Sequence, residues 1–262
     1  AAAWVELAEA GHQAIAALEA LAERTDRPAA WSELGRAKSA IGEREGARRA
    51  LLRASRGYAA AGELAAAAAA AYDAFKLAWV QDAFVDALEL VERAHRLAVE
   101  AEDRGARRRA LLAYFALLHR VGDLEGAGRA LELAREVVAE DDVASRVFLA
   151  NGAGVYAKGA GRLRLARRHF EAAARLTQLE GGRDRTFDVR HNLAQVLLDL
   201  GDIEAAAPVI EDVLSKWPDR GEDSETPSKL LLEGRLLAAQ GEHAAAAARF
   251  RAALEGTPLF DY

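Results

Sequence analysis

Short glycine turns recur along this chain at a nearly fixed step. In each, a glycine is followed by a polar or acidic residue, and the last four glycines are 39, 40 and 40 residues apart. A repeat of this length indicates that a chain is built from stacked copies of one supersecondary unit. Because each copy contacts only its neighbours, all 262 residues can form one array without a single large core. The five dipeptides are Gly42-Glu43, Gly122-Asp123, Gly161-Arg162, Gly201-Asp202 and Gly241-Glu242.

A second set of breaks lies about half a period away from the glycine turns. Turns that alternate with helix-length segments indicate helical hairpins, and the apolar residues are mostly Ala and Leu, which favour helices. No useful length of chain alternates apolar and polar residues with a period of two, so strands are not expected. We therefore predict an all-α protein with one repeat domain over residues 1–262. Its expected hairpins are 2–27, 28–61, 62–101, 102–141, 142–180, 181–221 and 222–258.

Two places depart from the regular pattern. The first hairpin is truncated, with a turn expected at Gly11 between helices at 2–10 and 12–24. The 80-residue interval between Gly42 and Gly122 has Gln81-Asp82 at its midpoint, where the turn glycine is missing. Glycine allows turn conformations that a Cβ atom penalises, so we expect an irregular hairpin at this point.

The residues inside the hairpins resemble the tetratricopeptide repeat. Trp31-Ser32-Glu33-Leu34-Gly35 begins one hairpin, and Ala246, Phe250, Ala253 and Pro258 follow the last turn at the family's spacing. The resemblance covers essentially the whole chain and implies a right-handed α-α superhelix. The step of about 40 residues is longer than the family's common 34, as in the longer-period members found in bacterial regulators and kinesin light chains.

Composition argues against several classes of function. A net charge of −6 gives no general attraction to nucleic acid or anionic membranes, and no run of 18 apolar residues is present. The absence of cysteine excludes disulfides and thiolate sites, and fits a cytoplasmic location. The chain also lacks methionine, even at its first position. We therefore expect a piece of a larger protein, whose oligomeric state the sequence leaves open.

No arrangement of residues indicates an enzyme, a cofactor or a metal site. The glycine-rich stretch 151–161 fails as a phosphate loop because its Lys158 precedes the final glycine and no Ser or Thr follows. Two basic clusters are interpreted as solvated helix faces that pair with nearby acidic residues. The clusters are Arg104, Arg107, Arg108 and Arg109, and Arg162, Arg164, Arg167 and Arg168. The six histidines are spread along the chain without a metal-binding motif: His12, His95, His119, His169, His191 and His243.

The resemblance also implies a binding surface. In tetratricopeptide arrays the first helix of each hairpin lines a concave groove that accepts peptides, and the amino-terminal half of this groove is basic and aromatic here. A groove of this kind suits an acidic or carboxylate-bearing segment of a protein partner. Carried onto this chain, the partner-binding positions are Arg36, Tyr72, Lys76, Trp79, His119, Asn151, Lys158, His191, Gln195 and Arg235.

Three functions are therefore open. The first is a non-catalytic scaffold that binds a peptide or partner protein in the groove, within a bacterial regulatory or signalling protein. The second is a sensor whose array closes around a signalling peptide or small molecule, which would change its radius of gyration on binding. The third is an engineered repeat protein, prompted by the lack of Met and Cys, although its repeats are far from identical.

Overall fold

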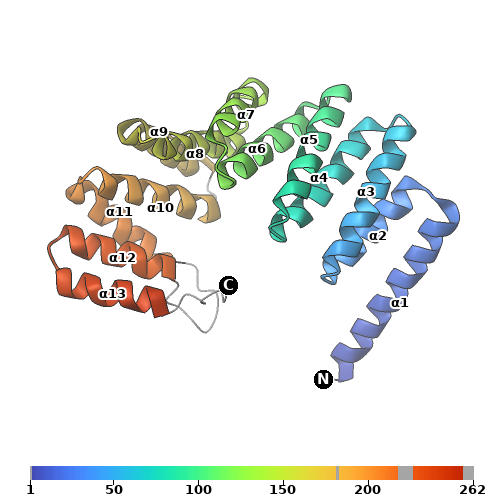
Figure 1. Ribbon diagram of the computed structural model, residues 1–262, viewed down its shortest axis with the longest axis horizontal. Helices are drawn as coiled ribbons and strands as arrows, with labels where there is room; N and C mark the ends of the chain where they lie inside the picture. Colours follow the sequence, from blue (N-terminus) through green and yellow to red (C-terminus); the bar gives the residue numbers. More distant parts are fainter. Residues whose placement is uncertain (1, 181–182, 218–226, 256–262) are drawn as a thin grey trace. The chain divides into compact units, whose positions relative to one another are not determined.

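The computed structural model describes residues 2–180, 183–217 and 227–255, and every element in these ranges is a helix (Figure 1). The expected all-α repeat fold is confirmed. The chain divides into two compact units, residues 1–137 and 138–262. The helices of unit 1 are α1 (Ala2–Thr25), α2 (Pro28–Ala40), α3 (Arg44–Ala60), α4 (Leu64–Val80), α5 (Phe84–Glu100), α6 (Arg104–Arg120) and α7 (Leu124–Val137). Those of unit 2 are α8 (Val143–Gly159), α9 (Leu163–Glu180), α10 (Arg183–Asp199), α11 (Ile203–Ser215), α12 (Pro227–Ala239) and α13 (His243–Glu255).

Unit 1 is built on a step of 20 residues. Helices α3, α4, α5 and α6 each have 17 residues, and a turn of three residues follows each of them. One residue in every turn has a positive φ, so the turn within a hairpin and the turn between hairpins are alike. The 40-residue repeat is therefore two helices of 17 residues and two turns of three. The positive-φ residues of these four turns are Gly62, Asp82, Glu102 and Gly122, and Asp26 after α1 and Gly42 after α2 also have a positive φ.

Each turn ends one helix and begins the next by local hydrogen bonds. The amide of Asp123 donates to the carbonyl of Leu118 at 2.9 Å, across the positive-φ Gly122. This is the six-residue closure that typically ends a helix at a left-handed residue. The carboxylate of Asp123 then accepts from the amide of Gly126 at 2.8 Å, which caps the start of α7. The glycine thus allows the first helix to end, and the acidic residue that follows caps the next helix.

The hairpin without a turn glycine is regular, so the expected irregularity is wrong. Asp82 takes the left-handed conformation itself, with φ 53°, and the amide of Ala83 donates to the carbonyl of Ala78 at 3.0 Å. The same closure forms at Gly62, where the amide of Glu63 donates to the carbonyl of Tyr58 at 2.9 Å. Asp is one of the few residues with a Cβ atom that visits this conformation readily.

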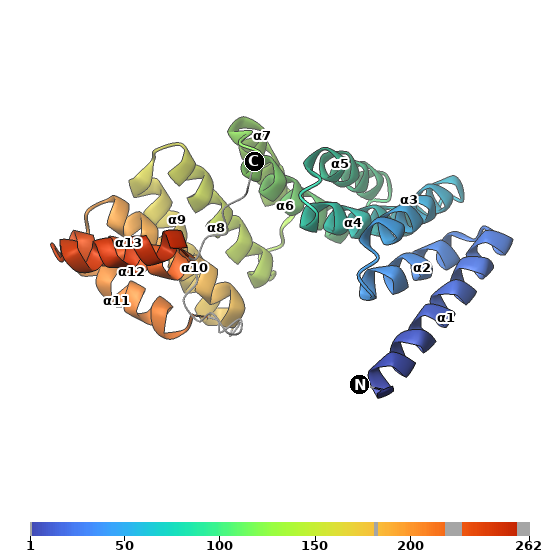
Figure 2. The same cartoon turned by 60° about the horizontal axis from the view of Figure 1, so that its bottom comes forward.

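The turn expected at Gly11 is not formed, so the prediction of a truncated first hairpin is wrong. Residues Ala2–Thr25 form one continuous helix, which packs against α2 (Figure 2). Gly11 lies within it and has no positive φ, unlike the turn glycines. A glycine inside a helix costs only about 1 kcal/mol relative to alanine, and the neighbouring Ala, Leu and Glu residues favour the helix.

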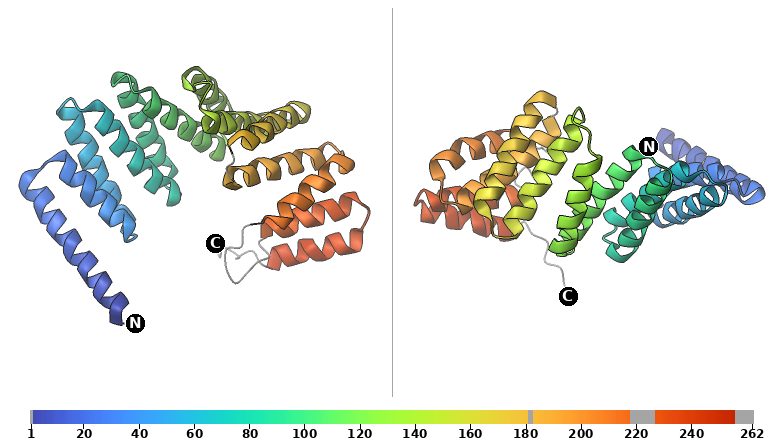
Figure 3. Two further views of the ribbon diagram at one scale, coloured as in Figure 1. Left: turned by 180° about the vertical axis from the view of Figure 1, so that it is seen from behind. Right: turned by 90° about the horizontal axis from the view of Figure 1, so that it is seen from above.

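Unit 2 contains three helical hairpins: α8 with α9, α10 with α11, and α12 with α13 (Figure 3). Gly161, Gly201 and Gly241 have positive φ and form the turns within these hairpins. The core lies between them, where Phe170 of α9 and Ile210 of α11 are fully buried. The expected breaks between hairpins, at 181–184 and 218–221, lie at least partly outside the described residues.

Glycines and alanines let the two helices of a hairpin cross at close range. A Cβ atom on Gly154 of α8 would lie 2.4 Å from Cε1 of Phe170, and one on Gly234 of α12 would lie 2.5 Å from Cε1 of Phe250. In unit 1, a Cβ atom on Gly35 would lie 2.6 Å from Cγ of Leu51. Each of these glycines therefore makes room for a large side chain of the partner helix.

Replacing Gly154 by Ala should lower the free energy of unfolding by about 1–3 kcal/mol, because the fully buried Phe170 would have to move. Urea denaturation followed by circular dichroism measures the change. Gly11→Ala is the matched control: nothing lies within 4 Å of the place that its Cβ atom would take, so alanine should stabilise the helix by about 0.5–1 kcal/mol. Equal effects at the two sites would contradict the packing argument.

The capping role of the acidic residue is tested by Asp123→Ala. Loss of the bond to the Gly126 amide should cost about 1 kcal/mol of unfolding free energy in the same assay. Glu63 occupies the corresponding position before α4 but makes no capping hydrogen bond through its side chain. Glu63→Ala should therefore change stability by less than about 0.5 kcal/mol.

Candidate functional site

The first helices of the hairpins carry the expected groove residues in both units. In unit 1 these helices are α2, α4 and α6, and in unit 2 they are α8, α10 and α12, where α10 packs against both of the others. We call the expected side chains, together with the polar residues that contact them, the unit 1 face and the unit 2 face. The unit 1 face is Arg36, Tyr72, Asp73, Lys76, Trp79 and His119. The unit 2 face is Asn151, Lys158, His191, Asn192, Gln195, Asp199 and Arg235.

Two cations of the unit 1 face share one carboxylate. Asp73 of α4 lies 2.7 Å from Nζ of Lys76 and 4.0 Å from Nε of Arg36, which projects from α2. Arg36 also pairs with Glu33 at 2.9 Å. The side chains of Arg36 and Lys76 are more than half exposed, so these pairs contribute little to stability. The face is therefore less basic than its arginine and lysine alone indicate.

Aromatic side chains form a row along α4. The ring centroids of Tyr72 and Phe75 are 5.6 Å apart, and those of Phe75 and Trp79 are 6.0 Å apart. Phe75 is buried in the core, while Tyr72 and Trp79 are half-buried. Burial raises the pKa of the Tyr72 phenol, against the opposing effect of nearby Lys76 and Arg109. Tyr72 and Trp79 can thus present ring surface to a ligand.

His119 of α6 lies apart from these groups. Its ring contacts Phe115, with centroids 6.2 Å apart. Burial lowers the pKa of His119, because the charged imidazolium is disfavoured in this half-buried position. Phe115 is not part of the unit 1 face, so this contact does not join His119 to the other expected residues.

Ionic contacts join the three first helices of unit 2. Lys158 of α8 donates to Oε1 of Gln195 at 2.6 Å and lies 3.5 Å from Asp199, both on α10. Arg235 of α12 donates to the other oxygen of Asp199 at 2.6 Å. As in unit 1, two cations share one carboxylate. The expected residues Lys158, Gln195 and Arg235 therefore form one network around Asp199.

His191 lies beside this network in an aromatic setting. Its ring centroid is 6.0 Å from that of Phe187 and 5.7 Å from that of Trp217, and its Nε2 is 3.2 Å from Nε2 of Gln195. Burial lowers the pKa of His191, and the charges of Lys158 and Arg235 lower it further, while Asp188 opposes them. The imidazole is therefore held neutral over a wider pH range than usual.

An amide pair extends the unit 2 face. Nδ2 of Asn192 on α10 donates to Oδ1 of Asn151 on α8 at 3.0 Å. Each amide has more donor and acceptor capacity than this one bond uses. The pair can therefore bind a peptide backbone or a polar side chain of a partner.

Sequence reasoning missed the two central carboxylates. Asp73 and Asp199 are absent from the expected site, although Asp73 lies three residues before Lys76 and Asp199 lies four residues after Gln195. Helical periodicity places residues at these spacings on one face, so the signal was present in the sequence. It was missed because the family pattern was carried over by position and gave no weight to charge balance.

The basic clusters have local roles. Arg167 pairs with Glu171 and Asp202, each at 2.7 Å, as expected for a solvated face. Arg104 donates to the carbonyl of Val137 at 2.9 Å. Within the described part of the chain, no three His, Asp or Glu side chains are placed to hold a metal ion. No helix of that part is both long and apolar enough to cross a membrane.

Comparison with known proteins identifies the repeats. The family model described as tetratricopeptide repeat matches residues 151–220 and, again, residues 191–259. Residues 151–259 belong to the tetratricopeptide repeat family. The resemblance seen in the sequence is thus confirmed for the family, while the longer-period subgroup stays a prediction. No curated protein matches the sequence.

Solved structures extend the likeness to the rest of the fold. A tetratricopeptide repeat protein from Parabacteroides merdae has a TM-score of 0.64 and 19% identity, with 99% of this chain and 95% of that chain covered. BtubC from P. vanneervenii has a TM-score of 0.63 and 20% identity, with 85% and 95% covered. A Rap protein complexed with Competence and Sporulation Factor has a TM-score of 0.58 and 13% identity, with 86% and 73% covered. At these identities the likeness concerns the fold alone.

His191 should make the stability of the tetratricopeptide repeats depend on pH. Its pKa is lower in the folded than in the unfolded chain, so the unfolded chain takes up the proton first as the pH falls below about 6.5. Stability from this group is therefore present above that pH and is lost on acidification. In urea denaturation at about pH 7.5 and about pH 5.5, His191→Asn should lose less stability than the wild type on acidification.

The exposed His243, at the start of α13, provides the control for this measurement. His243→Asn should show the same acid-induced loss as the wild type. A loss in His191→Asn as large as that of the wild type would show that His191 does not cause the effect.

Proposed function

We propose that this chain is a non-catalytic interaction module, and that the face of the first helices in each unit by itself binds a segment of a partner protein. The proposal rests mainly on the unit 2 face, where side chains from three successive hairpins are already ordered by their contacts with one another. Side chains held in place before binding lose less conformational entropy when a ligand arrives. The fold supports the same conclusion, because repeat arrays commonly bind extended partners along their stacked helices.

Charge favours a carboxylate-bearing segment as the partner. On the unit 1 face Arg36 and Lys76 share Asp73, and on the unit 2 face Lys158 and Arg235 share Asp199. On the unit 2 face Asp199 alone contacts both cations, and on the unit 1 face Glu33 also pairs with Arg36. The cations of both faces have more N–H donors than these contacts use, so an incoming carboxylate finds spare hydrogen-bonding capacity. The partial neutralisation by Asp73 and Asp199 favours a segment with a few acidic residues over a long acidic run.

The aromatic and amide groups supply the other contacts that a peptide needs. Tyr72 and Trp79 can pack against apolar side chains, and the Asn151–Asn192 pair can bind the peptide backbone. The Rap protein structure contains a bound factor, which fits a binding role for this type of fold. A setting within a bacterial regulatory protein remains part of the proposal.

Selection of peptides from a random display library tests this function. Peptides of about twelve residues would be selected on the immobilised protein, and the affinity of each would be measured by fluorescence anisotropy. Selected peptides should be enriched in Asp and Glu. The pair of changes Arg36→Gln with Lys76→Gln, or Lys158→Gln with Arg235→Gln, should weaken binding about tenfold.

Two exposed arginines away from the faces provide the control pair. Arg44 begins α3 and Arg129 lies on α7, and Arg44→Gln with Arg129→Gln removes the same charge from the protein. Binding in this variant should stay within about twofold of the wild type. If no peptides are selected, or if the control pair weakens binding as much as the face pairs, the proposed function is wrong.

A further inference from the structure

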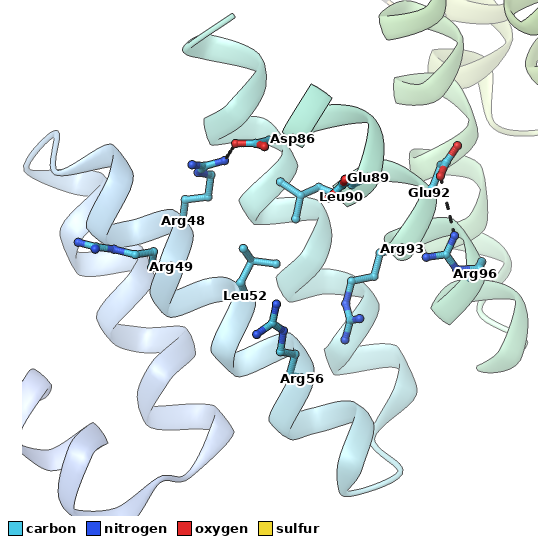
Figure 4. Close-up of a pocket in the computed structure, with 10 residues that line it drawn as sticks. All are labelled: Arg48, Arg49, Leu52, Arg56, Asp86, Glu89, Leu90, Glu92, Arg93 and Arg96. Carbon is cyan, nitrogen blue, oxygen red and sulfur yellow. Dashed lines mark hydrogen bonds and ion pairs between the residues drawn. The ribbon is translucent and has the colours of Figure 1, made fainter. Parts of the chain in front are cut away.

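A charged pocket opens on a different part of unit 1, between the second helices α3 and α5 (Figure 4). The unit 1 face lies on α2, α4 and α6, so none of its residues takes part. The pocket has a volume of about 450 Å³, and Leu52 and Leu90 form its apolar lining. Its charged lining is Arg48, Arg49, Arg56, Arg93 and Arg96, with Asp86, Glu89 and Glu92.

Two of the three carboxylates are already engaged by arginines at the ends of the pocket. Arg48 of α3 pairs with Asp86 of α5, and Arg96 lies 3.9 Å from Glu92 on the same helix (Figure 4). Glu92 also accepts from the hydroxyl of Tyr114 at 3.1 Å. These contacts leave Arg49, Arg56 and Arg93 of the lining without a carboxylate partner among the described residues.

A buried relay positions Arg93. Its Nε donates to Oγ of Ser55 at 3.1 Å, and Ser55, which is fully buried, donates to the carbonyl of Ala67 at 2.9 Å. This contact engages only the Nε–H group of Arg93, so the two terminal nitrogens are available to a ligand. Arg56 projects from α3, and both its side chain and that of Arg93 line the pocket (Figure 4).

Neither arginine has a carboxylate partner within the described residues. Glu89 lies four residues before Arg93 on α5, a spacing at which an ion pair is favourable in a helix. In the structure Glu89 is exposed and beyond ion-pair distance of Arg93. In solution Glu89 can therefore compete with a bound anion for Arg93, and replacing Glu89 tests whether Arg93 binds the anion.

Two like charges are held together here in a partly buried place. Burial lowers the pKa of Arg93, and the charges of Arg56 and Arg96 lower it further. A guanidinium nevertheless stays protonated in proteins, so the repulsion persists in the empty pocket. An anion between the two groups would remove that repulsion and gain charge-assisted hydrogen bonds.

We propose that Arg56 and Arg93 bind a phosphoryl group in this pocket. Two guanidinium forks in one pocket offer several N–H donors and two positive charges, which match three oxygens and a charge near −2. A carboxylate offers two oxygens and one charge, and so matches the site less well. The group can come from a small phosphorylated molecule or from a phosphorylated side chain of a partner, and binding at this pocket does not depend on the proposed peptide function.

Titration with inorganic phosphate tests the site directly. Binding would be measured by calorimetry at low ionic strength and about pH 7.5, with acetate as the comparison anion. Phosphate should bind more tightly than acetate. Arg56→Gln should weaken phosphate binding about tenfold, because one of the two forks is lost. Arg56 is exposed and has no structural partner in the described part of unit 1, so this variant should fold normally.

Three further variants sharpen the result. Arg44→Gln, on the same helix but outside the pocket, should leave binding within about twofold of the wild type. Glu89→Gln should strengthen binding roughly twofold, because the competitor for Arg93 is removed. Arg93→Gln should abolish binding, with circular dichroism to confirm that the loss of the Ser55 contact leaves the helices intact.

Two ligand arms distinguish the source of the phosphoryl group. Free O-phosphoserine and a phosphoserine peptide would be titrated in parallel. Tighter binding of the peptide assigns the site to a partner's side chain, and equal binding of the two ligands assigns it to a small molecule. Either assignment requires that Arg56→Gln weakens the binding. Equal affinity for phosphate and acetate, or equal effects of Arg56→Gln and Arg44→Gln, would overturn the proposal.

Discussion

The three-residue turn with one left-handed residue is the constraint on which the rest of unit 1 depends. It ends each helix by a local hydrogen bond and allows the next helix to begin at once, so helices of 17 residues repeat every 20. Equivalent positions on successive first helices are then 40 residues apart. Contacts between neighbouring hairpins consequently join residues whose separation in the sequence is close to this value. In unit 1 the separation is 38 residues both for Ser55 with Arg93 and for Asp82 with Arg120. In unit 2 it is 37 residues for Lys158 with Gln195 and 36 for Asp199 with Arg235.

Charge is distributed differently on the two kinds of surface. On the faces of the first helices, each pair of cations has a carboxylate between them, which fixes their positions and limits the net charge. Between α3 and α5, Arg48 pairs with Asp86 and Arg96 with Glu92, while Arg56 and Arg93 line the same pocket without a carboxylate partner in the described part of the chain. The first arrangement suits a ligand that brings a few acidic side chains along with apolar and backbone contacts. The second suits a single compact anion of high charge.

The fold could be predicted from the sequence because helices, turns and caps depend on neighbouring residues. The glycine turns and the small residues opposite Phe170 and Phe250 were sufficient to predict the hairpins. Both errors concerned what a single residue does. Gly11 was interpreted as a turn, yet glycine is tolerated inside a helix whose other residues favour it. Asp82 was interpreted as an irregularity, yet it adopts the conformation that glycine takes elsewhere.

For the candidate site, the sequence by itself determined which positions lie on the first helices and which residues of neighbouring hairpins are placed side by side. It did so because the period of the helix and the length of the turn are local properties. Only the tertiary structure decided how the charges pair. Asp73 and Asp199 each contact two cations, and Arg56 and Arg93 line one pocket with no carboxylate partner among the described residues, because these distances depend on how the helices of adjacent hairpins are offset. That offset is set by the packing of Ala, Leu and Phe side chains between the helices, where glycines make room for the larger ones.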